Sequence, residues 1–68
     1  MDIPAYLKKY GLSQQEFANQ LKVSQGLVWQ WINGRTRIKA ERAKQIEEVT
    51  GGAIRRRDLR PDLFDRAA

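Results

Sequence analysis

The sequence predicts an all-α fold, a compact bundle of about five short helices in a single domain spanning residues 1–68. Two observations carry this prediction. Apolar residues recur at helical spacing along four segments, and residues that cap or break helices stand at most of their ends. No segment alternates convincingly between apolar and polar residues, which is the pattern of a half-buried strand. A chain of 68 residues has room for one small domain.

The first expected helix covers about residues 2–10. Asp2 is placed to cap it, and Pro4 falls in the first turn, where a missing N–H needs no partner. Gly11 ends the helix. One apolar stripe is expected to face the core, with the tyrosine hydroxyls at its rim, and it consists of Ile3, Tyr6, Leu7 and Tyr10.

The second expected helix, residues 14–21, has the clearest start signal in the chain. Ser13 and Glu16 form a capping-box pattern, in which the serine hydroxyl accepts from the Glu16 amide and the Glu16 side chain reaches back. Its buried face is expected to consist of Phe17, Ala18 and Leu21. The small side chain of Ala18 suits the place where this helix approaches the next one.

The third expected helix covers about residues 25–32, with Ser24 as its cap and Asn33 and Gly34 as its stop. One of its faces is expected in the core, and it consists of Val28, Trp31 and Ile32. So few residues join this helix to the second that the two must cross at a large angle.

A fourth helix is expected at about residues 39–50, where Gly51 ends it. A basic loop with Arg35 and Arg37 leads into this helix. Its apolar stripe is expected to face the core and consists of Ala43, Ile46 and Val49.

A basic C-terminal tail is expected at residues 53–68. Residues 55–59 form a single helical turn, Pro61 stops it, and the last apolar pair, Leu63 and Phe64, folds back onto the body. Three consecutive arginines at residues 55–57 allow two interpretations. They contact phosphate, or they lie away from a nucleic acid near a dimer interface.

Composition excludes several classes of function. Thirteen Lys and Arg against eight Asp and Glu give a net charge of +5, which favours a polyanion as partner. Because the chain has no Cys or His, it forms no disulfide, a metal site is disfavoured, and the commonest catalytic base and nucleophile are missing. No glycine-rich phosphate loop is present. We therefore expect a binding protein without a cofactor, not an enzyme.

The same composition bears on location. No apolar run approaches the ~20 residues of a membrane span, and the N-terminus lacks the apolar region of a signal peptide. Reducing conditions suit a chain without cysteine. The sequence therefore predicts a cytoplasmic protein with no membrane partner.

The outward face of the third expected helix is the candidate functional surface. It carries no charge, although 31% of the chain is charged. Glutamine amides suit the edge of adenine, glycine permits close backbone approach, and a tryptophan ring suits a thymine methyl or a sugar. The residues expected to contact bases are Gln25, Gly26, Trp29 and Gln30. The alternative is an ordinary exposed face, with Trp29 packed against the tail or a partner chain.

Positive side chains frame this neutral face. The cations expected to contact phosphate are Lys22, Arg35, Arg37 and Lys39. Gln14 opens the preceding helix, where its amide and the positive end of the helix dipole can meet a phosphate. In proteins that bind double-stranded DNA, uncharged polar and apolar groups contact base edges and cations contact phosphates, and this arrangement provides both.

Residues 14–33, QQEFANQLKVSQGLVWQWIN, resemble the helix-turn-helix of the Cro and cI repressors of temperate phages. Further likeness lies in AERA at 40–43, IEEVTGGA at 46–53 and DLRPD at 58–62, which together make the chain similar to short prophage regulators of the Cro and YdaS type. The resemblance covers about residues 6–64. It implies a lambda-repressor-like fold with its motif at residues 13–33.

The resemblance also implies roles for single residues. Positions that face base edges in such repressors match Gln25, Gly26, Trp29 and Gln30, and positions that commonly touch phosphate match Gln14 and Asn33. One departure concerns Lys22, which stands where the family usually has glycine. A left-handed backbone there costs lysine about 1 kcal/mol, which predicts a slightly altered turn.

These observations together predict a sequence-specific regulator of transcription, a Cro-like repressor that occludes a promoter. One recognition helix contacts few base pairs, so a homodimer on a pseudo-palindromic operator is expected. We expect no second domain that would bind a small-molecule ligand. The alternative is an antitoxin-type interaction module, similar to YdaS-type proteins, whose tail binds a toxin and whose DNA binding regulates its own operon. RNA binding is a weaker alternative, because no stacking platform of paired surface aromatics is evident.

Overall fold

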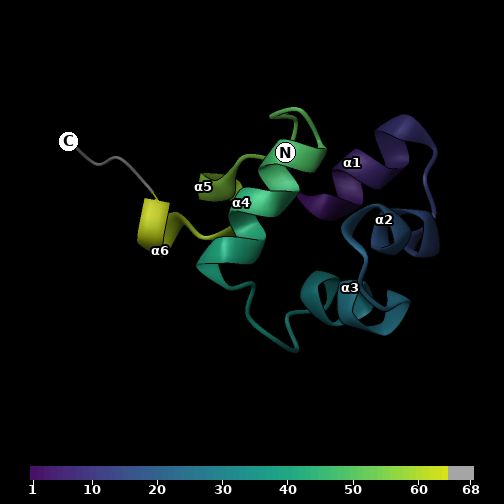
Figure 1. Cartoon of the computed structure of the whole chain (residues 1–68), viewed down its shortest axis with the longest axis horizontal. Coiled ribbons are helices and arrows are strands. Elements are labelled where there is room, and N and C mark those ends of the chain that lie inside the picture. Colours follow the sequence, from purple (N-terminus) through teal and green to yellow (C-terminus); the bar gives the residue numbers. More distant parts are fainter. Residues whose placement is uncertain (65–68) are drawn as a thin grey trace.

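The computed structural model describes residues 1–64, which form six helices and no strand (Figure 1). The all-α class predicted from the sequence is confirmed. The count exceeds the expected five because the tail forms two one-turn helices, and residues 65–68 of the predicted tail lie outside the described range. The helices are α1 (Ile3–Tyr10), α2 (Gln14–Leu21), α3 (Gln25–Ile32), α4 (Ala40–Val49), α5 (Arg56–Leu59) and α6 (Pro61–Phe64).

The first three helices begin at the capping residues that the sequence predicts. Each cap side chain accepts a hydrogen bond from the amide three residues on, which satisfies one free N–H of the first turn. Glu16 Oε1 also accepts from the Ser13 amide at 2.8 Å, so the capping box is complete. The three cap bonds are Ala5 N to Asp2 Oδ1 at 2.9 Å, Glu16 N to Ser13 Oγ at 3.0 Å and Leu27 N to Ser24 Oγ at 3.2 Å.

One apolar core joins α1, α2, α3 and α4 to the turn that follows α4. Two of its members, Ile38 and Ile54, were missed in the sequence. Both lie outside helices, where apolar periodicity gives no information. The buried side chains are Ile3, Tyr6, Leu7, Phe17, Ala18, Leu21, Val28, Ile38, Ala43, Ile46 and Ile54.

Two predicted core residues are wrong. Tyr10 is 52% exposed, because it ends α1 and its ring rests on that of Tyr6, with the ring centroids 4.8 Å apart. Val49 is 39% exposed at the end of α4, beyond the stretch of that helix that faces the core. Trp31 and Ile32 are only partly buried and pack against the edge of the core.

The tail also departs from expectation. Pro61 does follow the end of α5, but it also begins α6, where the first helical position needs no N–H. Phe64 folds back and packs against the core, as predicted. Leu63 does not, because it points away and is 51% exposed.

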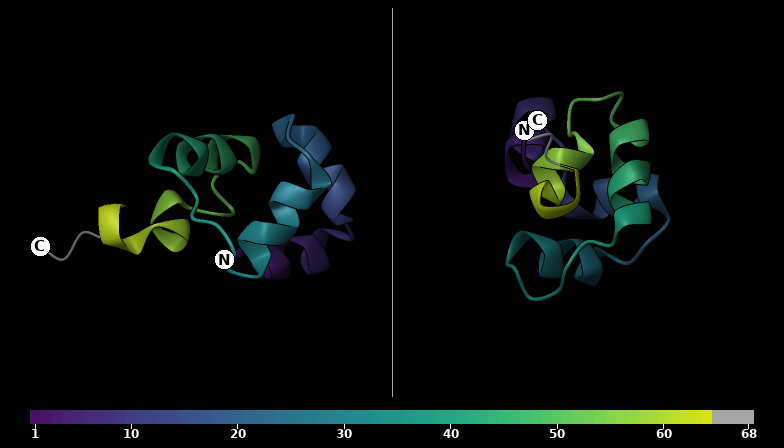
Figure 2. Two further views of the ribbon diagram at one scale, coloured as in Figure 1. Left: turned by 90° about the horizontal axis from the view of Figure 1, so that it is seen from below. Right: turned by 90° about the vertical axis from the view of Figure 1, so that its left-hand side faces the viewer.

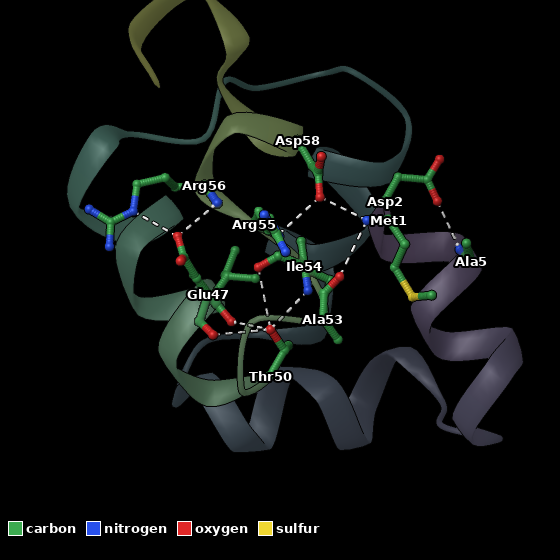
Figure 3. A network of polar contacts seen from close by, with 11 residues as sticks. Met1, Asp2, Ala5, Glu47, Thr50, Ala53, Ile54, Arg55, Arg56 and Asp58 are labelled. Carbon is green, nitrogen blue, oxygen red and sulfur yellow. Dashed lines mark hydrogen bonds and ion pairs between the residues drawn. The ribbon is translucent and has the colours of Figure 1, made fainter. Parts of the chain in front are cut away.

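Polar contacts attach the tail to the body (Figure 3). The Met1 amino group contacts Asp58 Oδ2 at 2.7 Å, and Arg56 Nε donates to Glu47 Oε1 at 2.7 Å. Thr50 closes the end of α4, since its Oγ1 donates to the Ile46 carbonyl at 2.8 Å and accepts from the Ile54 amide at 3.1 Å. These contacts hold the start of α5 against α4 and the N-terminus.

The six helices spread along an axis of 36 Å. The α1–α2 end of the molecule and α6 lie at opposite ends of this axis (Figures 1 and 2). The loop between α3 and α4 runs along the same edge as α3 (Figure 1). Among residues 1–64, no helix is long and apolar enough to cross a membrane.

Candidate nucleic-acid interface

The helix pair α2–α3 is packed around small and branched side chains. Ala18 of α2 and Val28 of α3 are fully buried, and α2 packs against both α3 and α4. The Val23 amide donates to the Ala18 carbonyl at 3.0 Å, which ties the turn back onto α2. This packing fixes the direction of α3 and leaves its opposite face outward.

The turn between the two helices keeps a left-handed residue at Lys22, with φ 59° and ψ 42°. It is the one non-glycine residue of the described range with a positive φ. The Lys22 amide donates to the carbonyls of Ala18 and Asn19, which closes the end of α2. Lysine thus itself adopts the left-handed conformation whose cost was expected from the sequence.

Four residues on α3 were predicted to contact bases, and α3 presents them together. Gly26, Trp29 and Gln30 are exposed, and Gln25 is half-buried. No charged residue lies on α3. The helix therefore offers an uncharged surface of amides, one glycine and one indole, which we call the reading face (Gln25, Gly26, Trp29 and Gln30).

Gln25 is held by a partner on the preceding helix. Its Nε2 donates to Gln14 Oε1 at 2.6 Å, so the first residues of α2 and α3 are joined through their side chains. This bond fixes the amide plane of Gln25 and leaves its Oε1 and one N–H available. It also leaves both N–H groups of the Gln14 amide available, which is the group predicted to meet a phosphate.

Nothing inside the fold requires a glycine at position 26. Its φ lies outside the left-handed region, and a Cβ built there would meet only the Ser24 hydroxyl, at 4.0 Å. Glycine in a helix costs about 0.5–1 kcal/mol relative to alanine. An external surface that approaches the backbone closely is a physical reason for it.

Trp29 stands at the C-terminal end of the reading face and is 42% exposed. The guanidinium carbon of Arg35 lies 5.6 Å from the centre of its ring, a cation–π arrangement. Asn33 Nδ2 donates to the Trp29 carbonyl at 2.9 Å and caps the end of α3. The predicted phosphate contact Asn33 is thus also a structural cap, with one N–H left over.

The predicted phosphate-binding cations flank α3 at both ends. Lys22 precedes its start, and the loop at residues 35–39 follows its end (Figure 1). All of them are exposed, and none belongs to an ion pair among residues 1–64. They are Lys22, Arg35, Arg37 and Lys39.

One cation near this surface was missed in the sequence. Arg42, in the first turn of α4, borders a hollow of about 280 Å³ between α3 and the loop, beside Arg37 and Lys39. Its guanidinium donates to Gln45, whose Nε2 donates in turn to the Leu21 carbonyl at 3.2 Å. The spacing of three between Lys39 and Arg42 was a signal that could have found it.

The three arginines at residues 55–57 have different surroundings in the structure. Arg56 is committed to Glu47, through its Nε at 2.7 Å and its backbone amide at 3.0 Å. The Arg55 amide donates to Asp58 Oδ2 at 3.0 Å, and the Arg55 and Arg57 side chains are exposed. Arg56 and Arg57 belong to α5, and Arg55 directly precedes it.

A comparison with protein families gives one finding. A family model described as "Bacterial toxin YdaS" matches residues 6–68. No curated protein and no solved structure matches the chain.

Proposed function

This chain belongs to the YdaS family, and from that premise we propose that it is a regulator that binds specific sequences of double-stranded DNA through α3. The observation that carries the proposal is the composition of the interface. An uncharged, amide-rich reading face on one helix lies between unpaired cations on both sides. Bases are read by hydrogen bonds and apolar contacts, whereas phosphates are bound by charge.

Each residue of the reading face has a role in this proposal. Gln25, oriented by Gln14, and Gln30 form hydrogen bonds with base edges in the major groove. Gly26 lets the start of α3 approach the DNA closely. Trp29 packs on a thymine methyl or a sugar while it orients Arg35 toward the backbone.

The cations supply most of the affinity. Four of them flank α3, so a dimer neutralises about eight phosphates, and the slope of log affinity against log salt is of order −5 to −8 at ~0.9 per phosphate. Arg37→Ala should weaken specific and random duplex DNA alike. Titrations at several salt concentrations measure both quantities, and a slope near zero contradicts the electrostatic part of the proposal.

A single α3 contacts too few base pairs for high specificity. We therefore propose that two copies bind a pseudo-palindromic operator whose half-sites are one helical turn apart, and that they repress by covering a promoter. Selection of bound sequences from a random duplex pool tests this directly. A palindromic consensus supports the dimer, and an enriched single half-site contradicts it.

The decisive experiment distinguishes recognition of base sequence from electrostatic attraction to phosphates. Gln25→Ala and Gln30→Ala carry no change in charge, so each should weaken the selected operator by about 1–3 kcal/mol and leave random duplex nearly unaffected. Gln20→Ala, an exposed glutamine of α2, is the matched control and should change neither. Equal losses on both DNAs mean that the glutamines only position the protein. No loss on either places the reading face elsewhere.

The family description names a bacterial toxin, and this favours one second candidate, a member of a toxin–antitoxin pair. In that case the tail is the contact surface, and DNA binding serves only to regulate the operon. A stable complex with the product of a neighbouring gene, lost when the tail is changed, is the outcome that supports this candidate.

A further inference from the structure

Arg60 lies outside both the core and the reading face, yet three of its guanidinium nitrogens are engaged. It stands between α5 and α6, and its side chain is only 13% exposed. Nε and Nη2 donate to the two carboxylate oxygens of Asp62, at 2.9 and 2.6 Å. Nη1 donates to the backbone carbonyl of Ile38 at 2.8 Å.

The carbonyl that Arg60 holds belongs to the basic loop at residues 35–39. Backbone hydrogen bonds join this loop to the neighbouring helices at its two ends, where the Arg35 amide donates to the Gln30 carbonyl at 2.8 Å and the Lys39 carbonyl accepts from the Ala43 amide at 2.9 Å. Between these ends, Ile38 anchors the loop, because its side chain is buried in the core while its carbonyl accepts from Arg60. The neighbours on either side of this anchor are Arg37 and Lys39, two cations assigned to phosphate.

The positive charge of Arg60 is balanced by the neighbouring Asp62 carboxylate. A bidentate pair between guanidinium and carboxylate is strong and directional. The hydrogen bonds from Arg60 lower the pKa of the Asp62 carboxyl, and the nearby charge of Arg37 contributes, so Asp62 is ionised at neutral pH. Arg60 and Asp62 together therefore present little net charge to a polyanion.

We propose that Arg60, oriented by Asp62, is a positioning residue for DNA binding that fixes the loop so that Arg37 and Lys39 meet phosphates without further ordering. A loop ordered before binding loses less conformational entropy when it binds. The inference rests on the proposed function, since the loop must be a DNA contact. It gives the one-turn tail helices a part in DNA binding, although they lie away from the reading face.

Asp62→Ala tests the inference because two arguments predict opposite signs. The variant gains one positive charge and frees Arg37 from a nearby carboxylate, so electrostatics alone predicts tighter binding. Loss of the contacts by which Arg60 joins Asp62 to the Ile38 carbonyl, which we call the brace, predicts weaker binding by about tenfold, the effect of one charge-assisted hydrogen bond. Glu48→Ala, at the opposite end of α4, gains the same charge without touching the loop and should bind slightly more tightly.

Arg60 itself is tested by two substitutions. Arg60→Ala should weaken DNA binding by at least the same factor, whereas Lys8→Ala, which removes an exposed charge on α1, should have a smaller effect. Arg60→Lys keeps the charge but cannot hold the carboxylate and the Ile38 carbonyl in one planar fork. The DNA affinity of Arg60→Lys should therefore lie between those of Arg60→Ala and the parent.

All titrations use salt series at a temperature where circular dichroism shows each variant folded. Weaker binding and a flatter salt slope for Asp62→Ala support the brace. Unchanged or tighter binding overturns it, as does complete rescue by Arg60→Lys. If the parent binds no duplex DNA, the proposed function fails and this inference with it. A parent that binds normally beside an unaffected Asp62→Ala overturns the brace alone.

Discussion

The helix pair α2–α3 and the tail helices α5–α6 are attached to the molecule by different forces. On α2, Phe17, Ala18 and Leu21 are at most 1% exposed. Neither α5 nor α6 contains a buried residue. Conversely, all three ion pairs of residues 1–64 lie at the tail, and none involves α2 or α3; they are Met1–Asp58, Arg56–Glu47 and Arg60–Asp62.

This difference has a physical consequence. Apolar burial responds little to salt or moderate acid, whereas partly exposed ion pairs weaken under both. The unit that carries the reading face is therefore the robust part of the fold. The tail, which holds the basic loop through Arg60, is the part that solution conditions can loosen.

The largest expected effect is a difference in stability loss between matched phenylalanine substitutions in the two regions. Phe17→Ala should cost about 3–5 kcal/mol of unfolding free energy, because a fully buried ring leaves a cavity. Phe64→Ala, on the partly buried ring of α6, should cost about 1 kcal/mol. Urea denaturation followed by circular dichroism measures both. Similar losses would mean that the tail is as firmly packed as α2.

Ala18→Leu tests the close approach of α2 and α3. Ala18 is fully buried, and a larger side chain there must push the two helices apart at a cost of about 1–3 kcal/mol. Thermal melts compare the variant with the parent. A variant as stable as the parent would show that the two helices do not meet at Ala18.

Ser13→Ala should cost about 1 kcal/mol, because the Glu16 amide loses its acceptor in the capping box. Ser24→Ala removes the corresponding cap of α3 and is expected to have a similar effect. The same thermal melts apply. If neither melt changes, the caps contribute nothing and packing alone defines both helix starts.

The smallest expected effect is a dependence of the tail on pH. Hydrogen bonds from Arg56 lower the pKa of Glu47 below its ordinary 4.5, and those from the N-terminus and the Arg55 amide lower the pKa of Asp58 below its ordinary 3.8. A lowered folded pKa stabilises the fold above the ordinary value, and this contribution is lost as the pH falls through the folded value. Stability should therefore decline below about pH 4.5.

Urea denaturation at pH 7 and pH 3 measures this decline. The double variant Glu47→Gln and Asp58→Asn should show a smaller difference between the two pH values than the parent. The effect should be modest, because exposed ion pairs contribute little. An equal decline in both proteins would place the acid-sensitive groups elsewhere.

Local signals made most of the fold predictable. Caps at Asp2, Ser13 and Ser24 lie within three residues of the amides they satisfy, so the sequence specifies those helix starts. Tyr10 and Val49 were misplaced, because helical spacing does not show where the neighbouring helices end.

The candidate site was predictable in its members but not in their contacts. Gln14 and Gln25 were expected to contact DNA separately, and their mutual bond depends on the angle at which α2 crosses α3. The bond from Arg60 to Ile38 joins residues 22 positions apart outside any helix, so no periodicity indicates it. Whether these residues contact DNA stays a prediction.

The placement of the two tryptophans of the chain two residues apart on α3 makes this helix a source of two optical signals. Trp29 is exposed on the reading face beneath Arg35, whereas Trp31 is partly buried against the core. Emission from Trp29 should respond to DNA, and emission from Trp31 should respond to unfolding. Trp31→Phe would isolate the first signal and Trp29→Phe the second, so DNA binding and stability could each be followed by intrinsic fluorescence without an attached dye.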